Sequence, residues 1–216
     1  MMVSVITRLS SIRRVIGQFL GYSLLVSGLV GCSQLEVEMT SGAEEALLPP
    51  GMARIVFIRS TPFNHKALAA LYSVKGDGLE FIGILNNETR ISHDIVPGNH
   101  AFMVAAGTVD YMRAEIRPGF TYYAVLVSGI GSSTRQFSLW PVRKGMRGEF
   151  YTDSSEFPRW LATTGVVKNN ARTRQWDRDN RSRIKEMHDK LWPVWEKGQS
   201  SYEINEHTLH ADDGLN

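Results

Sequence analysis

The chain has 216 residues, among them 24 lysines and arginines, 22 aspartates and glutamates, and one cysteine. The first 31 residues hold three of the basic residues and no acid, so the chain without them carries 21 basic and 22 acidic residues. That balance argues against a nucleic-acid partner, and one cysteine excludes a disulfide within the chain. About 185 residues remain, enough for one core and a smaller appendage.

The N-terminal segment has the pattern of an export signal. Arg8, Arg13 and Arg14 precede an apolar run over residues 15–31. A basic region followed by an apolar stretch and small residues is typical of a secretory signal peptide. The run has 17 residues, and a membrane-spanning helix needs about 20, so a permanent anchor is the less favoured alternative. We therefore expect residues 1–31 to be a signal peptide.

The end of the apolar run, Leu29-Val30-Gly31-Cys32, resembles the lipobox of bacterial lipoproteins. The resemblance implies that the Cys32 sulfur takes a diacylglycerol, that the chain is cut just before it, and that the new amine is acylated. Two or more acyl chains hold a protein firmly on a membrane, whereas one does not. The family's inner-membrane retention signal has Asp after the cysteine, and Ser33 stands there. The resemblance thus implies an outer-membrane lipoprotein facing the periplasm, with the lipid on Cys32 in place of a cofactor.

Residues 32–51 are expected to be a lipidated, flexible tether. Residues 33–51 contain four glutamates and no basic residue, and they end in Pro-Pro-Gly. A free chain of this length has a root-mean-square span of about 25 Å. The following domain would then lie close to the bilayer.

Residues 52–148 are expected to form a β domain. Short runs rich in β-branched and aromatic residues alternate with glycine and proline turns, which favours a sandwich or a barrel. In the run over 108–116, Met112, Ala114 and Ile116 fall on one face. The predicted strands cover residues 53–60, 79–85, 89–96, 100–107, 108–116 and 120–129.

Three pieces of this region, FIGIL (81–85), IVPGNHAF (95–102) and IRPGFTYYAVLV (116–127), resemble PEGA-type β-sandwiches of bacterial envelope lipoproteins. The resemblance implies a fold and an envelope location, and it carries over no catalytic residue. Pro97-Gly98 and Pro118-Gly119 are expected to form turns. Gly83 is expected to permit a bulge or a close backbone approach. The fold class is therefore mainly β, a small antiparallel sandwich followed by a C-terminal helical arm.

Residues 149–198 are expected to hold a connector and that arm. A short helix is predicted over 156–163 and a long one over 169–198, which starts at asparagine and stops at glycine. Pro193 should kink the long helix or end it early. The apolar stripe on one face consists of Trp176, Ile184, Met187, Leu191 and Trp195.

Residues 199–216 contain four acids and no lysine or arginine. We expect this acidic tail to be solvated and disordered. The alternative is that it folds back on the basic helix.

A partner-binding surface is predicted on the long helix. Its tryptophans are expected mostly to fill the joint with the sheet, and Trp192, beside the stripe, is the candidate for an exposed contact. A basic face is the second candidate, for anionic headgroups or an acidic partner, and the alternative is a simply solvated face. That face consists of Arg172, Arg174, Arg178, Arg181 and Arg183.

No residue pattern predicts catalysis. His207 and His210 with Asp212 and Asp213 could supply metal ligands, and so could His93 and His100, but zinc sites need three or four converging ligands. We therefore expect no metal, no catalytic residue and no small-molecule substrate. The sequence favours a binding or structural module of the cell envelope with a protein partner. The alternatives are an envelope hydrolase or metal-dependent enzyme, and an accessory subunit of a secretion or surface-assembly complex.

Overall fold

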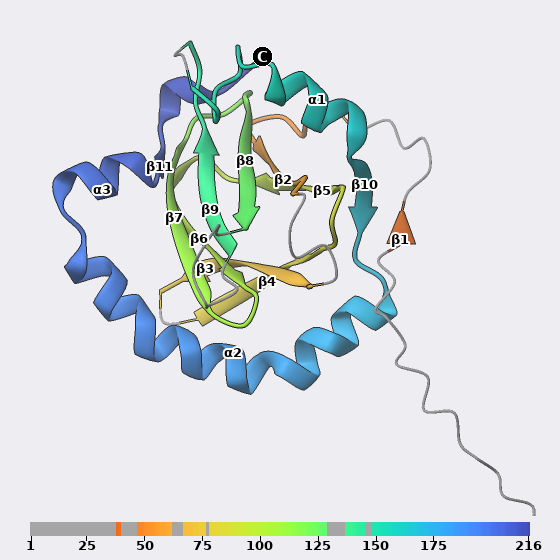
Figure 1. The fold of residues 1–216 in the computed structure, drawn as a ribbon, viewed down its shortest axis with the longest axis vertical. Helices are drawn as coiled ribbons and strands as arrows, with labels where there is room; N and C mark the ends of the chain where they lie inside the picture. The colour runs from red at the N-terminus through yellow and green to blue at the C-terminus, as the bar shows by residue number, and fades with distance from the viewer. Residues whose placement is uncertain (1–37, 40–46, 62–66, 77, 129–136, 146–147) are drawn as a thin grey trace, which may run out of the picture. The chain divides into compact units, whose positions relative to one another are not determined.

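The computed structural model describes residues 38–39, 47–61, 67–76, 78–128, 137–145 and 148–216. The chain divides into two units, Met1–Gln34 and Leu35–Asn216. The first unit lies outside the described residues, so everything below concerns the second. Its strands and helices appear in Figure 1.

The described strands form two sheets that face each other across the core, with a helix outside each. One sheet has the order β1-β10-β5-β2-β8-β9 and the other β11-β7-β6-β3-β4. The strands are β1 (Glu38–Met39), β2 (Ala53–Arg59), β3 (Ala69–Lys75), β4 (Gly78–Leu85), β5 (Thr89–Ile95), β6 (Gly98–Ala105), β7 (Val109–Ile116), β8 (Thr121–Ser128), β9 (Phe137–Val142), β10 (Gly165–Lys168) and β11 (Thr208–Leu209). The helices are α1 (Glu156–Thr163), α2 (Ala171–Gly198) and α3 (Ser201–Glu206), and a 3-10 turn covers Ala211–Asp213.

The expected fold class is confirmed: the chain is mainly β, a sandwich followed by a long C-terminal helix. Most neighbouring strands are antiparallel, as expected. Three described pairs, β2 with β8, β5 with β10 and β7 with β11, are parallel. These parallel pairs join segments that are distant in sequence, and such pairings cannot be read from local turn patterns.

The core lies between the inner faces of the two sheets. Phe57 of β2 meets Phe102 of β6 edge to face, with ring centroids 5.2 Å apart, and both side chains are fully buried. Met112, Ala114 and Ile116 of β7 are also buried, as their alternation predicts. Interdigitating side chains from two sheets are the usual way in which a sandwich buries its apolar surface.

Gly83 confirms the expectation of a bulge and a close approach. The pairing of β3 with β4 shifts register between Leu71 and Tyr72, opposite this part of β4. A Cβ on Gly83 would lie 2.4 Å from Ile91 Cδ1 and 3.0 Å from Asn169 Oδ1. The same Asn169 side chain donates from Nδ2 to the Ile82 carbonyl across 2.7 Å. This hydrogen bond links the chain just before α2 to the edge strand β4, next to the bulge.

Helices α1 and α2 cover the outer faces of different sheets. Phe157 and Trp160 of α1 pack on the six-stranded sheet, where Tyr123 meets Phe157 edge to face at 4.9 Å. Helix α2 packs on the five-stranded sheet and curves past it in Figure 1. The short helix expected over 156–163 is therefore present at those residues.

Helix α2 begins at a capping box. Asn170 accepts a hydrogen bond from the Thr173 backbone N–H across 2.9 Å, and the Thr173 hydroxyl oxygen accepts one from the Asn170 N–H. This exchange satisfies donors that a helix start leaves free. Of the two outcomes predicted for Pro193, a kink or an early end, the early end is wrong, since α2 continues to Gly198 with the proline inside it. Tertiary packing of His188 before the proline and Trp195 after it outweighs the lost backbone hydrogen bond.

The interpretation of residues 199–216 as a solvated, disordered tail is wrong. After α3, β11 pairs with β7, and Leu209 is fully buried. The Tyr122 hydroxyl donates to the Ala211 carbonyl across 3.1 Å, and Leu215 exchanges two backbone hydrogen bonds with Thr121. The alternative that the tail folds onto the basic helix does not describe it either, because it joins the strands. Backbone pairing holds it, and acidic composition does not report backbone pairing.

The expected tether is not free along its whole length. Within it, Glu38 pairs with Lys168 and Met39 with Val167, antiparallel, so β1 is joined to β10.

Candidate interaction surface

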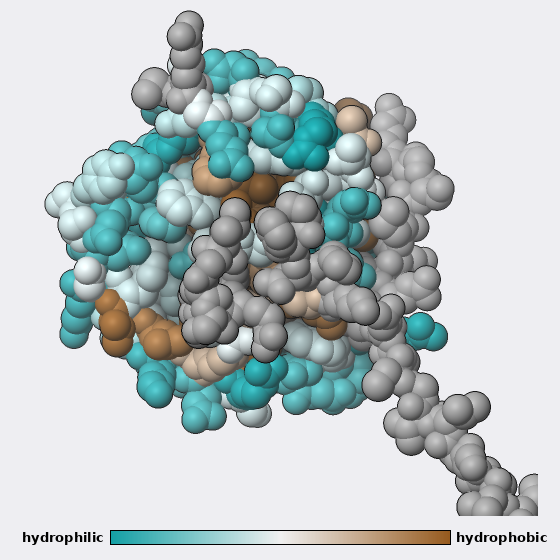
Figure 2. Space-filling model, in the orientation of Figure 1, coloured by the Kyte–Doolittle hydropathy of each residue, from teal (hydrophilic) through white to brown (hydrophobic). Residues whose placement is uncertain are grey.

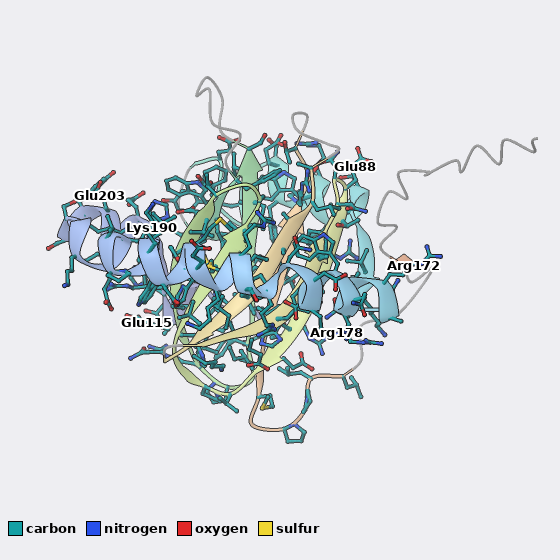
Figure 3. All side chains as sticks on the ribbon, turned by 90° about the horizontal axis from the view of Figure 1, so that it is seen from below. Glu88, Glu115, Arg172, Arg178, Lys190 and Glu203 are labelled. Carbon is teal, nitrogen blue, oxygen red and sulfur yellow. The ribbon has the colours of Figure 1, made fainter. Side chains whose placement is uncertain are left out.

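Helix α2 lies across the outer face of the five-stranded sheet, which carries a row of large side chains. Register places Phe81, Tyr72, Met103 and Tyr111 opposite one another on β4, β3, β6 and β7. Viewed from the α2 side, Figure 3 shows the helix crossing these strands. Its N-terminal half meets β3 and β4, and its C-terminal half meets β7.

The first contact in the joint between α2 and the five-stranded sheet is polar and buried. The Tyr72 hydroxyl donates to Asp177 Oδ1 across 2.9 Å, and Arg181 Nη2 donates to Asp177 Oδ2 across 2.8 Å. Arg181 also donates to the Leu79 carbonyl at the edge strand, across 2.9 Å. Burial, followed by the Asp177 charge, raises the pKa of Tyr72 above its ordinary value, so the hydroxyl keeps its proton and acts as the donor.

The second contact is aromatic. The Tyr111 hydroxyl lies 3.2 Å from His188 Nδ1, and the Tyr111 ring meets the Trp192 and Trp195 rings at centroid distances of 5.0 and 5.3 Å. Arg113 lies over the Trp195 ring at 5.4 Å. Burial raises the pKa of Tyr111 and lowers the pKa of His188, which favours the neutral form of both groups.

Trp192 therefore lies in the joint with the sheet. It is half-buried, packing on Tyr111 and stacking with Trp195 at 5.3 Å. The expectation that tryptophans fill this joint is consistent with Trp176, Trp192 and Trp195, which all pack against the core. The large apolar side chain that α2 exposes is Val194, at 66 % of its surface, and Tyr202 of α3 is 71 % exposed.

The five arginines of the predicted basic face are all exposed, but they do not form one uniform set. Arg181 joins α2 to the sheet, because it donates hydrogen bonds to Asp177 on its own helix and to the Leu79 carbonyl on β4. Arg174, Arg178 and Arg183 contact uncharged neighbours on the same helix or just before it. Figure 3 shows Arg172 and Arg178 on the N-terminal part of α2, and Lys190 toward its other end.

The two halves of α2 differ in charge. From Lys168 to Arg183 there are six basic and two acidic residues, whereas from Ile184 to Gly198 there are three of each. Figure 2 shows hydrophobic atoms gathered along the C-terminal part of the helix, on a face that is otherwise mostly hydrophilic. The helix thus offers a cationic half and a neutral, more apolar half.

The histidines considered as metal ligands have other contacts. The His207 ring packs against the Trp140 ring in a tilted arrangement, with centroids 4.4 Å apart, and His210 Nε2 lies 3.0 Å from Asn205 Oδ1. Asp213 accepts backbone hydrogen bonds from Lys144 and His210. Within the described ranges, no three His, Cys, Asp or Glu side chains come together as a metal site requires.

Sequence reasoning missed the buried polar residues of α2. Thr173, Asp177 and His188 are buried with Ile184 on the face that meets the sheet. These four residues are spaced 4, 7 and 4 positions apart, which is the same helical period as that of the apolar stripe. That periodicity could have identified them as residues of the buried face. Arg59 was also missed. It is fully buried over the Phe137 ring and donates to the Leu85 carbonyl, and burial lowers its pKa to about 10.

Cys32 and the apolar run before it lie outside the described residues. Among the helices that the structure describes, none is both long enough and apolar enough to span a bilayer. No family model matches the chain, and no curated protein is similar enough to count as a relative.

Proposed function

We propose that the chain is a lipoprotein of the bacterial cell envelope, anchored through acylated Cys32, which acts as a binding or structural module without catalysis of its own. Its β domain is a PEGA-like sandwich, and it resides at the outer membrane facing the periplasm. The observation that carries the proposal is the unit boundary between Gln34 and Leu35. Cleavage before Cys32 leaves the whole compact unit intact, with a lipid attachment point just ahead of it.

The lipobox residues support this proposal from the sequence side. Leu29, Val30 and Gly31 provide the small and aliphatic positions before Cys32, and the apolar run ends there. A cysteine at this position, in a chain with no other, has a chemical use as an acylation site and no disulfide partner. Two or three acyl chains suffice to hold the module on a membrane.

The partner surface in this proposal is the apolar end of α2, defined as Leu191, Trp192, Val194 and Trp195. Val194 is mostly exposed, Leu191 is half-buried, and Trp192 and Trp195 are half-buried against the core. Aromatic side chains held rigid by a scaffold are favoured anchors in protein interfaces. An exposed aliphatic side chain beside them adds apolar area that a protein partner can cover.

The test of the anchor is intact mass with membrane fractionation of the full-length chain beside Cys32→Ser. The wild type is expected to lose residues 1–31, to gain acyl mass and to fractionate with the outer membrane. Cys32→Ser should keep its N-terminus and gain no lipid, whereas Ser33→Ala, the neighbouring control, should be acylated like the wild type. An unmodified Cys32 in the wild type would contradict the proposal.

The test of the partner surface is crosslinking in intact envelopes. Val194→Glu should lose crosslinks that the wild type makes, because it places a charge in the centre of an apolar contact. Ser182→Glu is the matched control, since it adds the same charge at an exposed position of the same helix. Equal crosslinking by both variants would remove the apolar end of α2 from the proposal.

A further inference from the structure

The pairing of β1 fixes where the chain from the anchor reaches the folded unit. Glu38 pairs with Lys168 and Met39 with Val167 in antiparallel register, so the N-terminal end of β1 lies beside the C-terminal end of β10. Two residues after Lys168, Asn170 caps α2. Figure 1 shows β1 beside β10, and β10 leading into the start of α2.

The covalent distance from the anchor to this point is short. Six residue steps separate Cys32 from Glu38, and a fully extended chain covers at most about 3.3–3.6 Å per residue. Cys32 therefore lies no farther than about 20 Å from the backbone that pairs with Lys168. Along the chain, the start of α2 is therefore the part of the helix that a lipid on Cys32 would reach most directly.

The net positive charge of α2 is concentrated at this same end. We define the cationic end as Lys168, Arg172, Arg174 and Arg178, which are all exposed. Arg174 donates to the Asn169 carbonyl and Arg178 to the Gln175 side chain, so these contacts leave their charges uncompensated. Guanidinium groups bind phosphate oxygens through paired hydrogen bonds, which suits a phospholipid headgroup.

We propose that the cationic end of α2 rests on anionic phospholipid headgroups of the membrane that holds the anchor. This inference rests on the proposed membrane attachment and adds an orientation to it. The apolar end lies about 20 residues further along α2, about 30 Å along its axis, and is thereby kept clear of the bilayer for a protein partner.

A headgroup surface fits this end better than an acidic protein does, because the anchor itself brings the membrane here. The attraction needs no further partner, and attachment holds the local lipid concentration high. Each cation near an anionic surface strengthens binding about fivefold, and salt weakens the effect.

The test uses the full-length chain in vesicles, as wild type and as Cys32→Ser. The acyl chains anchor the first, and the uncleaved apolar run anchors the second, so in both forms the chain leaves the bilayer close to residue 32. Neither form carries a free thiol, so Ala171→Cys at the start of α2 takes a single fluorophore. Ser201→Cys labels the far end. Lipids with a headgroup quencher report whether each label lies at the surface.

In vesicles with phosphatidylglycerol, we expect quenching at position 171 and none at 201. In phosphatidylcholine alone, or in 0.5 M salt, quenching at 171 should fall at least tenfold. The combined variant Arg172→Glu, Arg174→Glu, Arg178→Glu should lose it as well. Its matched control is Lys185→Glu, Lys190→Glu, Lys197→Glu, which changes the same charge on the other half of the helix and should keep it. Glutamates near a helix start favour the helix, so unfolding of α2 does not explain the loss.

Absence of quenching at 171 in anionic vesicles, or equal loss in both combined variants, would overturn the inference. So would a combined arginine variant that keeps its quenching but loses protein crosslinks in envelopes, since the surface would then serve an acidic protein. Intact mass of the same samples reports the anchor separately. A wild type without acyl mass, quenched at 171 all the same, would refute lipidation and leave the headgroup surface standing.

Discussion

Tyr72 and Asp177 are 105 positions apart in the sequence, and the Tyr72 hydroxyl donates to the Asp177 carboxylate across 2.9 Å in the buried joint between β3 and α2. This bond links the long helix to the sheet at a point where neither side chain meets water freely. Asp177 has one further partner, Arg181, which is itself half exposed. The position of α2 on the sandwich depends on this polar contact as well as on its aromatic ones.

Tyr72→Phe should therefore destabilise the chain by about 1–3 kcal/mol, because it leaves a buried carboxylate oxygen without its donor. The free energy of unfolding, measured with urea, checks this. Tyr202→Phe removes the same hydroxyl from a side chain that is 71 % exposed, and it should change stability by less than about 0.5 kcal/mol. Equal effects at the two sites would contradict the importance of the Tyr72–Asp177 bond.

Stability should fall as the pH drops from 7.5 to 5.5. Burial lowers the pKa of His188, and also of His93 and His100, so the unfolded chain takes up protons more readily than the folded one. For one such group the slope is at most about 1.4 kcal/mol per pH unit, and the effect begins near the unfolded pKa of about 6.5. Asp110, whose pKa burial raises, contributes in the opposite sense, so variants are compared with each other.

His188→Asn should make this pH dependence shallower, because it removes one of the groups that cause it. Urea unfolding at several pH values gives the slope, which is separate from any constant loss of stability. His210→Asn is the control, since it makes the same substitution outside the contact between α2 and the sheet. An unaltered slope in His188→Asn would show that protonation of His188 does not oppose folding.

Gly214→Ala should destabilise the chain by about 1–3 kcal/mol, since a Cβ there would lie 2.7 Å from Phe120 Cβ and 2.9 Å from Tyr122 Cζ. A Cβ attached directly to the backbone and the ring atom of a buried tyrosine cannot give way as the tip of a flexible side chain can. Gly198→Ala is the control, because nothing lies within 4 Å of its Cβ position. Thermal unfolding of both variants measures the difference, and a neutral Gly214→Ala would mean that the C-terminal segment is loosely held.

Leu209→Ala should cost about 2–5 kcal/mol, as expected for removing a fully buried leucine side chain. Leu47→Ala makes the same substitution at a side chain that is 95 % exposed, and it should be nearly neutral. Urea unfolding distinguishes the two. If Leu209→Ala were as mild as Leu47→Ala, the last residues would contribute little to the core.

Local patterns predicted most strands, and the reasons are visible in particular residues. Met112, Ala114 and Ile116 alternate because every second residue of β7 faces the core. β3 was not predicted, since its Ala69, Ala70 and Leu71 carry little β-branched or aromatic signal, although all three are fully buried. Tyr111 lies on the opposite face of the same strand, and it is buried as well because α2 covers that face.

The candidate surface was predicted only in part. The sequence placed Arg172, Arg174 and Arg178 on an exposed helix because charge and helical period are local properties. It did not separate Arg181, which is bound to Asp177 and to the edge strand. It also proposed Trp192 as an exposed contact, whereas that side chain is half-buried and contacts Tyr111.

By itself, the sequence determined the lipobox pattern, the mainly β class, the starts of α1 and α2 and most strand positions. These are set by neighbouring residues through turns, caps and hydrophobic period. Only the tertiary structure decided that the acidic tail joins the strands, that polar residues line the buried face of α2, and that β1 lies at the cationic end. Those relationships join residues 95 to 130 positions apart, and their free energy comes from burial and pairing that exist only once the chain has folded.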